Sequence, residues 1–244
     1  MLKGKYCFKV RTYECDAEGL ATMPSICNYL QEAASIHAGE LGFSKSDFDH
    51  SGENISWVLT RLIVNMEAYP KWGDEVIVET FPRGGRRIAA WRDFEIKNSD
   101  GTVLGVATSE WMIIDLTARK TVAIPQNVLS CIDDSIIPVL GSNPFSKLRF
   151  PNECPDPVFS SHAQKSHIDL NGHVNNVRYI EWMLEPCETP RPKKMEVVFR
   201  GEAFAGDEVN VSVIAEDDGL LHRVFSCEGK DYIIAKTVFC KSVN

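Results

Sequence analysis

The chain has 244 residues, of which 44% are hydrophobic and 25% charged, as in an ordinary soluble globular protein. The length suits two domains of about 120 residues or a single large one. A formal net charge of -8 argues against nonspecific binding to nucleic acid or anionic membranes. No apolar run approaches the ~20 residues that cross a bilayer, and no signal peptide follows Met1, so we expect a cytoplasmic location and no membrane span.

The eight cysteines are spread singly along the chain, with no Cys-x-x-Cys pair. This spacing argues against a zinc site or a redox motif, and reduced thiols are expected. The sequence also has no Gly-rich phosphate loop and no His/Cys cluster at metal-ligand spacing. We therefore predict neither a metal ion nor a cofactor.

The first half of the chain predicts a strand, a helix and then four strands. The first strand is expected from Lys5 to Tyr13, and the helix from Pro24 to about Ala38, ending near Gly39 or Gly42. A long loop is expected from Phe43 to Ile55. The four β-rich segments that follow, separated by turn signals, are Trp57 to Ala68, Glu75 to Phe81, Ile88 to Lys97 and Thr102 to Leu116.

The second half repeats this order. Phe159 to Ser166 predicts a strand, and a helix is expected to end near Pro186. Four strands are then expected at Lys194 to Gly201, Glu208 to Glu216, Leu221 to Cys227 and Tyr232 to Ser242. The motif Asp16-Ala17-Glu18-Gly19-Leu20 recurs as Asp169-Leu170-Asn171-Gly172-His173. We infer two copies of one unit, at residues 1–124 and 158–244, joined by a linker at 125–157.

This pattern predicts an α+β fold with two tandem units, each an antiparallel sheet wrapped around a central helix. A single unit would leave one edge of its sheet open. Pairing the two units edge to edge would cover those edges.

Three polar residues, Asp169, Asn171 and His173, stand at alternate positions just before the second helix. In an extended segment they would all leave one face of the backbone. Asn175 or Asn176 is a suitable N-cap for the helix, whose free N–H groups can hold an oxyanion. From the residues alone, a turn in which Asp169 and Asn171 bond to nearby backbone is an equally good interpretation.

Several motifs resemble those of the acyl-ACP thioesterases, the bacterial relatives of the plant fatty-acyl-ACP thioesterases, which have a tandem double hotdog fold. The motifs are Asp169 to Trp182, Tyr69 to Val76, Arg86-Arg87, Trp91-Arg92-Asp93, Ala107 to Trp111, Ile124-Pro125 and Phe199 to Glu202. The resemblance implies a catalytic set of Asp169, Asn171, His173 and Glu202. Relatives often have a cysteine after that glutamate, whereas this chain has Ala203, which favours carboxylate-assisted attack by water.

On this basis Glu202 is the expected general base, and His173 orients water or shuttles a proton. Asn171 fixes the substrate or the water, and Asp169 holds Asn171 or His173 in place. A covalent route through a carboxylate is left open. The first copy has Asp16, Glu18 and Leu20 in place of the polar trio and Tyr69 in place of Glu202, so one active site per chain is expected.

The remaining expectations concern the substrate and its carrier. The acyl chain and thioester are expected to contact Asn175, Asn176, Trp57, Leu59, Met66 and Trp72, although core packing is the more ordinary role for the last four. An acidic acyl carrier protein with a phosphopantetheine arm is the expected partner. Its docking surface is expected to include Arg83, Arg86, Arg87, Arg178, Arg191, Lys193 and Lys194, for which plain solvation is the default.

The predicted function is hydrolysis of fatty acyl-ACP to free fatty acid and ACP. Two alternatives are an acyl-CoA thioesterase on the same fold and a noncatalytic acyl-binding or carrier-docking protein. The sequence leaves acyl chain length open, and it leaves open whether the protein forms a homodimer.

Overall fold

The structure, a computed structural model, describes residues 3–240 apart from residues 53 and 133–134. The long helix α1 (Met23–Glu40) follows strand β1 (Gly4–Lys9). Thr22 caps α1 by accepting the N–H of Ser25, and Pro24 lies in the first turn, where its missing N–H costs no hydrogen bond. The other elements of the first half are α2 (Lys45–Ser51), β2 (Ile55–Met66), β3 (Glu75–Arg86), β4 (Ala89–Asn98), β5 (Val103–Asp115) and β6 (Lys120–Val122).

The loop expected after α1 contains the helix α2. Ser44 and Asp47 form a capping box at its start, and Phe48 is its buried residue. Phe48 packs in a small cluster with Ile113 and with Val128 of the helical turn α3 (Gln126–Leu129). One buried side chain in seven residues is too little for a periodic signal, which is why the sequence did not predict this helix.

The second half contains the elements that its pattern predicts, with ends shifted by a few residues. These are β7 (Phe159–His162), α4 (Asn176–Leu184), β8 (Lys194–Phe199), β9 (Glu208–Glu216), β10 (Gly219–Phe225) and β11 (Asp231–Val238). The predicted end of the last strand, Ser242, lies outside the described residues.

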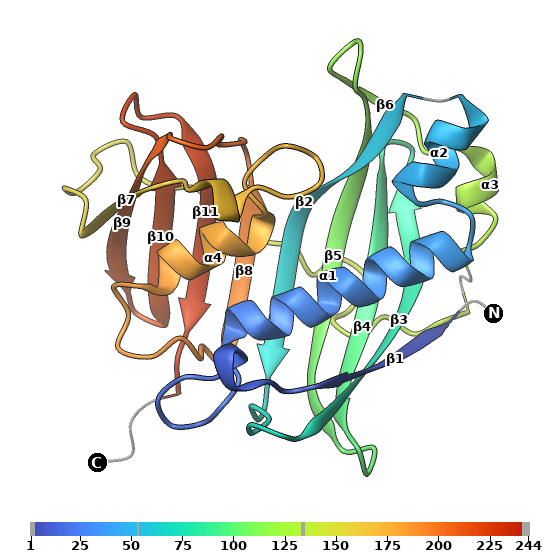
Figure 1. Cartoon of the computed structure of the whole chain (residues 1–244). Helices are drawn as coiled ribbons and strands as arrows, with labels where there is room; N and C mark the ends of the chain where they lie inside the picture. Colours follow the sequence, from blue (N-terminus) through green and yellow to red (C-terminus); the bar gives the residue numbers. More distant parts are fainter. Residues whose placement is uncertain (1–2, 53, 133–134, 241–244) are drawn as a thin grey trace.

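The strands of both halves form one antiparallel sheet, in the order β1-β3-β4-β5-β2-β8-β11-β10-β9-β7, with β6 paired to β5 (Figure 1). Strands β2 and β8 join the halves, with Leu62 opposite Val197. The expected pairing of the two units edge to edge is confirmed, as is the α+β class.

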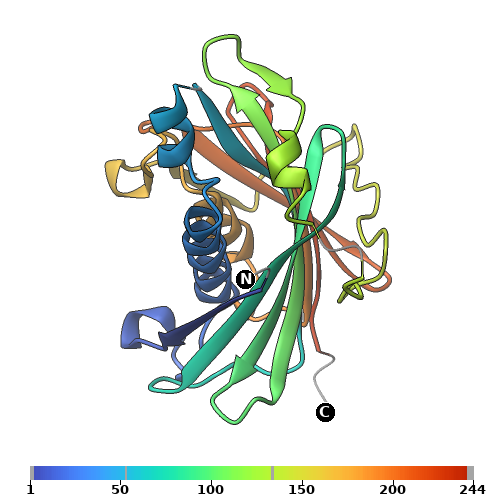
Figure 2. The same cartoon turned by 90° about the vertical axis from the view of Figure 1, so that its right-hand side faces the viewer.

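Both long helices pack on the same side of the curved sheet, as the view along its edge shows (Figure 2). Met23, Ile26 and Leu30 of α1 and Ile180 and Met183 of α4 are almost fully buried in one continuous core. Burial of each such side chain contributes roughly 1.5–3 kcal/mol. No described helix is long and apolar enough to span a bilayer.

The segment between the two halves crosses the other side of the sheet (Figure 2). The Val139 N–H donates to Asp93 of β4 at 3.0 Å, the Ser146 N–H donates to Glu196 of β8 at 2.8 Å, and the carbonyl of Pro155 accepts from Ser212 of β9 at 2.8 Å. The connecting segment therefore covers the face of the sheet that lies opposite α1 and α4.

Candidate active site

Asp169, Asn171 and His173 lie in a tight turn, which is one of the two interpretations that the residues alone left open. The N–H of Asp169 donates to the carbonyl of His173 at 2.9 Å, and the N–H of Gly172 donates to that of Asp169 at 3.0 Å. Asp169 Oδ1 accepts the N–H of Asn171 at 2.8 Å, and Gly172 has a φ of 80°, which favours glycine. The Asp169 side chain thus fixes the backbone that carries both Asn171 and His173.

Helix α4 begins directly after this turn. Asn175 is its N-cap, and its Oδ1 accepts the N–H of Val177 at 2.9 Å. The N–H of Arg178 donates to the carbonyl of Asn175. The N–H groups of Val177 and Arg178 are thus both bonded, whereas the N–H of Asn176 has no acceptor among the described residues. This free N–H at the start of the helix can donate to an oxyanion.

Glu202 lies in the loop three residues beyond the end of β8. Its neighbour Ala203 fixes this loop: its N–H donates to Tyr179 Oη at 2.7 Å, and its carbonyl accepts the N–H of Val174 at 3.0 Å. Burial raises the pKa of Tyr179, so its hydroxyl stays protonated. Ala203 itself is completely buried, so a side chain at this position faces the core.

The carboxylate of Glu202 lies between one side chain from each half of the chain. Its Oε1 is 3.5 Å from Nδ1 of His173, and its Oε2 is 3.5 Å from Nη2 of Arg119. The His173 ring packs edge-on against Phe204, with ring centroids 5.1 Å apart. Sequence reasoning missed Arg119, because no pattern linked it to a residue 83 positions later.

A cavity of about 1110 Å³ brings these residues together with the first half of the chain. Asp169, Asn171, His173 and Glu202 all line it, as does Asn176. Trp57 and Leu59 of β2 line it too, in agreement with the expectation for these two residues. Its size is that of a site for a small organic ligand or an acyl chain.

Three residues expected to contact the acyl chain or the thioester are not among the described residues that line the cavity: Asn175, whose side chain instead caps α4, and two apolar residues. Met66 is 2% exposed and packs in the main core, and it is not among the described residues that line the cavity. Trp72 is 64% exposed in the turn before β3. Apolar character alone predicted both, and it does not distinguish a cavity wall from a core or a surface turn.

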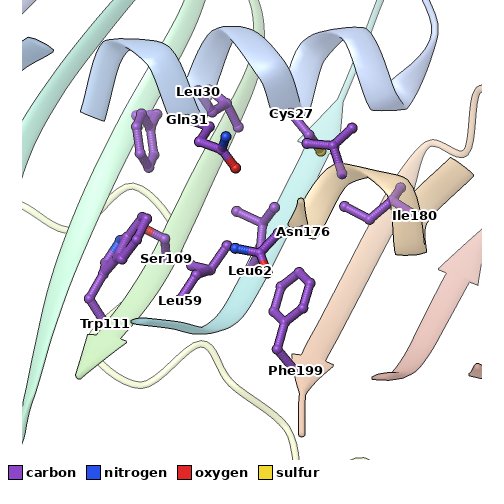
Figure 3. A pocket seen from close by; sticks show the side chains of 12 residues that line it. Cys27, Leu30, Gln31, Leu59, Leu62, Ser109, Trp111, Asn176, Ile180 and Phe199 are labelled. Carbon is purple, nitrogen blue, oxygen red and sulfur yellow. The ribbon is translucent and has the colours of Figure 1, made fainter. Parts of the chain in front are cut away.

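Between the helices and the sheet is a narrow apolar pocket, where Gln31 of α1 and Asn176 of α4 point inward (Figure 3). Leu59, Trp111 and Phe199 line both this pocket and the large cavity. Trp111 is held in place because its indole N–H donates to Ser109 Oγ at 2.7 Å. The sequence did not single out Trp111 or Phe199 as ligand contacts, because aromatic residues on a buried strand face are usually core.

The basic residues expected to dock a carrier have different environments. Arg83 is 5% exposed and lies 3.2 Å from the buried Asp93, so its assignment to a docking surface is wrong. Arg191 bonds to Asp16 and Glu18. Of the others, Arg178 pairs with Glu181 and Lys193 with Glu67, and Arg86, Arg87 and Lys194 are exposed.

Within the part of the chain that the structure describes, no group of three or more His, Cys, Asp and Glu side chains is arranged to hold a metal ion. The eight cysteines are all free thiols. The polar groups that line the cavity around Glu202 include carboxylates, side-chain amides and the imidazole of His173.

Comparison with solved structures defines the class of protein. The chain is similar to an acyl-ACP thioesterase from Bacteroides thetaiotaomicron, with a TM-score of 0.81 and 26% identity over 98% of each chain. Its fold is also that of the 12:0-ACP thioesterase from Umbellularia californica, with a TM-score of 0.83 and 22% identity over 98% of this chain and 97% of the other. The architecture is therefore that of two tandem hotdog units.

Comparison of sequences gives the family. The family models for the acyl-ACP thioesterase N-terminal and C-terminal domains match residues 2–132 and 159–241. The chain therefore belongs to the acyl-ACP thioesterase family.

The curated relatives are longer than this chain. The palmitoyl-acyl carrier protein thioesterase of Gossypium hirsutum is 33% identical over 75% of this chain and 46% of the relative. Oleoyl-acyl carrier protein thioesterase 1 of Arabidopsis thaliana is 32% identical over 83% of this chain and 61% of the relative. The matches thus span about half to three fifths of these relatives.

Proposed function

We propose that this protein is a thioester hydrolase that converts fatty acyl-ACP and water to a free fatty acid and ACP. The observation that carries the proposal is the convergence of Asp169, Asn171, His173 and Glu202 on one large cavity that extends into the first unit. The relatives named above support it, since their names specify palmitoyl-, oleoyl- and other acyl-ACP thioesters.

In the proposed reaction, the acyl chain lies among Trp57, Leu59, Trp111 and Phe199, and the thioester carbonyl lies near the start of α4. Glu202 accepts a proton from water as the water oxygen attacks the carbonyl carbon. The amide N–H of Asn176 and the side chain of Asn171 donate to the developing oxyanion.

The tetrahedral intermediate then collapses with cleavage of the C–S bond. The thiol of the carrier arm leaves with the proton that Glu202 took from water, and His173 beside Glu202 orients the water and relays that proton. Asp169 acts through the backbone of the turn, by keeping Asn171 and His173 in position.

Carrier recognition is proposed to use the exposed Arg86 and Arg87, which would attract an acidic carrier protein. The double substitution Arg86→Ser and Arg87→Ser would then raise KM for acyl-ACP and leave KM for the matching acyl-CoA unchanged. An equal KM for acyl-ACP in the variant and the wild type would show that Arg86 and Arg87 do not take part in docking the carrier.

The direct test is steady-state hydrolysis of an acyl-ACP panel of varied chain length, with the same acyl groups on CoA as the second arm. The proposal predicts a higher kcat/KM on ACP for the best acyl group. A large preference for CoA would instead make the protein an acyl-CoA thioesterase. Binding of acyl-ACP without turnover of any thioester would make it an acyl-binding protein.

A further inference from the structure

Arg119 occupies an unusual backbone position in the turn between β5 and β6. Its φ is 54°, the one positive value at a residue other than glycine within the described part of the chain. Side chains with a Cβ are disfavoured in this left-handed region, where glycine or asparagine is the usual choice. A residue held there against its preference points to a role for the side chain.

The surrounding turn holds Arg119 in this conformation. Asp115 Oδ1 accepts the N–H groups of Thr117 and Ala118, both at 2.8 Å, and the carbonyl of Asp115 accepts the N–H of Arg119 at 2.8 Å. Asn54 Nδ2 donates to Thr117 Oγ1 at 2.8 Å and ties the turn to the start of β2. These bonds involve the backbone and neighbours of Arg119, so the arginine side chain is not needed to make them.

The Arg119 side chain instead extends from the first unit to the second. Its Nη2 is 3.5 Å from Glu202 Oε2, and it lines the same cavity as Glu202 and His173. The arginine side chain is 62% exposed and the glutamate side chain 34% exposed. An ion pair this exposed contributes little to stability, so the contact is poorly explained as a structural one.

We propose that Arg119 is a positioning residue for Glu202, supplied to the active site of the second unit by the first. The inference rests on the proposed hydrolase function. Glu202 lies in a loop and has two oxygens to orient. Contact of Oε2 with the guanidinium directs Oε1 toward His173 and the attacking water. The catalytic unit is therefore incomplete without the turn of its noncatalytic neighbour.

The test uses Arg119→Gly and Arg119→Asn, because both residues accept a positive φ and remove the guanidinium. We expect kcat on the best acyl-ACP to fall about tenfold through loss of orientation, with KM within about twofold of the wild type. The melting temperature should stay the same or rise, since backbone strain is relieved. Lys120→Gln, an equal loss of charge at the next residue, is the matched control and should leave both quantities unchanged.

A second measurement tests whether Arg119 acts through Glu202. In a Glu202→Gln background, Arg119→Gly should change kcat by less than about twofold, because the two effects are not additive when one residue acts through the other. Equal losses in both backgrounds, wild-type kcat in Arg119→Gly, or a lowered melting temperature in both Arg119 variants would each overturn the inference. Absence of turnover by the wild type itself would refute the proposed function instead.

Discussion

The turns at Asp16 and at Asp169 have the same backbone and different surroundings. In the first, the N–H of Asp16 donates to the carbonyl of Leu20 at 2.9 Å, and the N–H of Gly19 donates to that of Asp16 at 3.0 Å. The bonds at Asp169, His173 and Gly172 have the same two lengths, and Gly19 and Gly172 have φ values of 76° and 80°. The repeat in the sequence is thus a repeat of one hydrogen-bonded turn.

The side chains around the two turns distinguish them. Arg191 of the second unit lies 2.7 Å from Asp16 and 2.6 Å from Glu18, and fills the space beside the first turn. The Tyr69 hydroxyl donates to the carbonyl of Pro192 at 2.6 Å. At the second turn, Asp169, Asn171 and His173 line the large cavity. The aspartate and the glycine therefore make the turn, and the residues placed on it and around it distinguish the two copies.

The largest difference between the turns is expected at the positions of His173 and Leu20. His173→Ala should lower kcat on acyl-ACP by about 1,000-fold, because it removes the group that orients water and relays the proton. Leu20→Ala is the matched change in the first turn and should leave kcat within about twofold. Equal losses in steady-state assays of the two variants would mean that both turns contribute to the chemistry.

A buried histidine of the second unit should make the folded chain sensitive to acid. Burial lowers the pKa of His222 in β10 to about 4 from an ordinary value of 6.5. Between these values the unfolded chain binds more protons, so the free energy of unfolding should fall by up to about 3 kcal/mol as pH drops from 6.5 to 4. Denaturant unfolding at several pH values measures this effect. The free energy of unfolding should depend less steeply on pH in His222→Gln than in the wild type. An equally steep dependence in both proteins would contradict the lowered pKa of His222.

A smaller effect is expected from Asp16→Ala, which breaks the pair with Arg191. Both side chains are largely buried, with 13% and 16% exposure, so the free energy of unfolding should fall by about 2 kcal/mol. The kcat of the folded variant should stay near that of the wild type. A loss of kcat without loss of stability would show that the first turn has a catalytic role.

The smallest effect is expected at Tyr69, the first-unit counterpart of Glu202. Tyr69→Phe removes one hydrogen bond to the carbonyl of Pro192, and should lower the free energy of unfolding by about 1 kcal/mol. Its kcat should be unchanged. Collapse of activity in this variant would contradict the view that each chain has one active site.

The sequence predicted the fold well where its signals are local and repeated. The proline in the first turn of α1 and the strand-forming residues of β9 predicted those elements, and the repeat led to the pairing of the two units. It left the conformation around Asp169 undecided, because alternate polar residues occur both in strands and in turns closed by an aspartate and a glycine. It failed for Met66, Trp72 and Arg83, whose exposure depends on tertiary neighbours.

The site was predictable only in part for the same reason. The family motif identified Asp169, Asn171, His173 and Glu202, and these residues line one cavity. Their catalytic roles stay predictions. Arg119 and Trp111 are brought to that cavity by pairing of strands distant in sequence, which no local pattern reveals.

The central claim is that each chain has one catalytic turn, completed by the carboxylate of Glu202. The most direct test is kcat of Glu202→Gln at saturating acyl-ACP, with the melting temperature measured on the same sample. We expect kcat to fall by at least about 100-fold with an unchanged melting temperature, as when a general base is removed. A kcat near that of the wild type would contradict it.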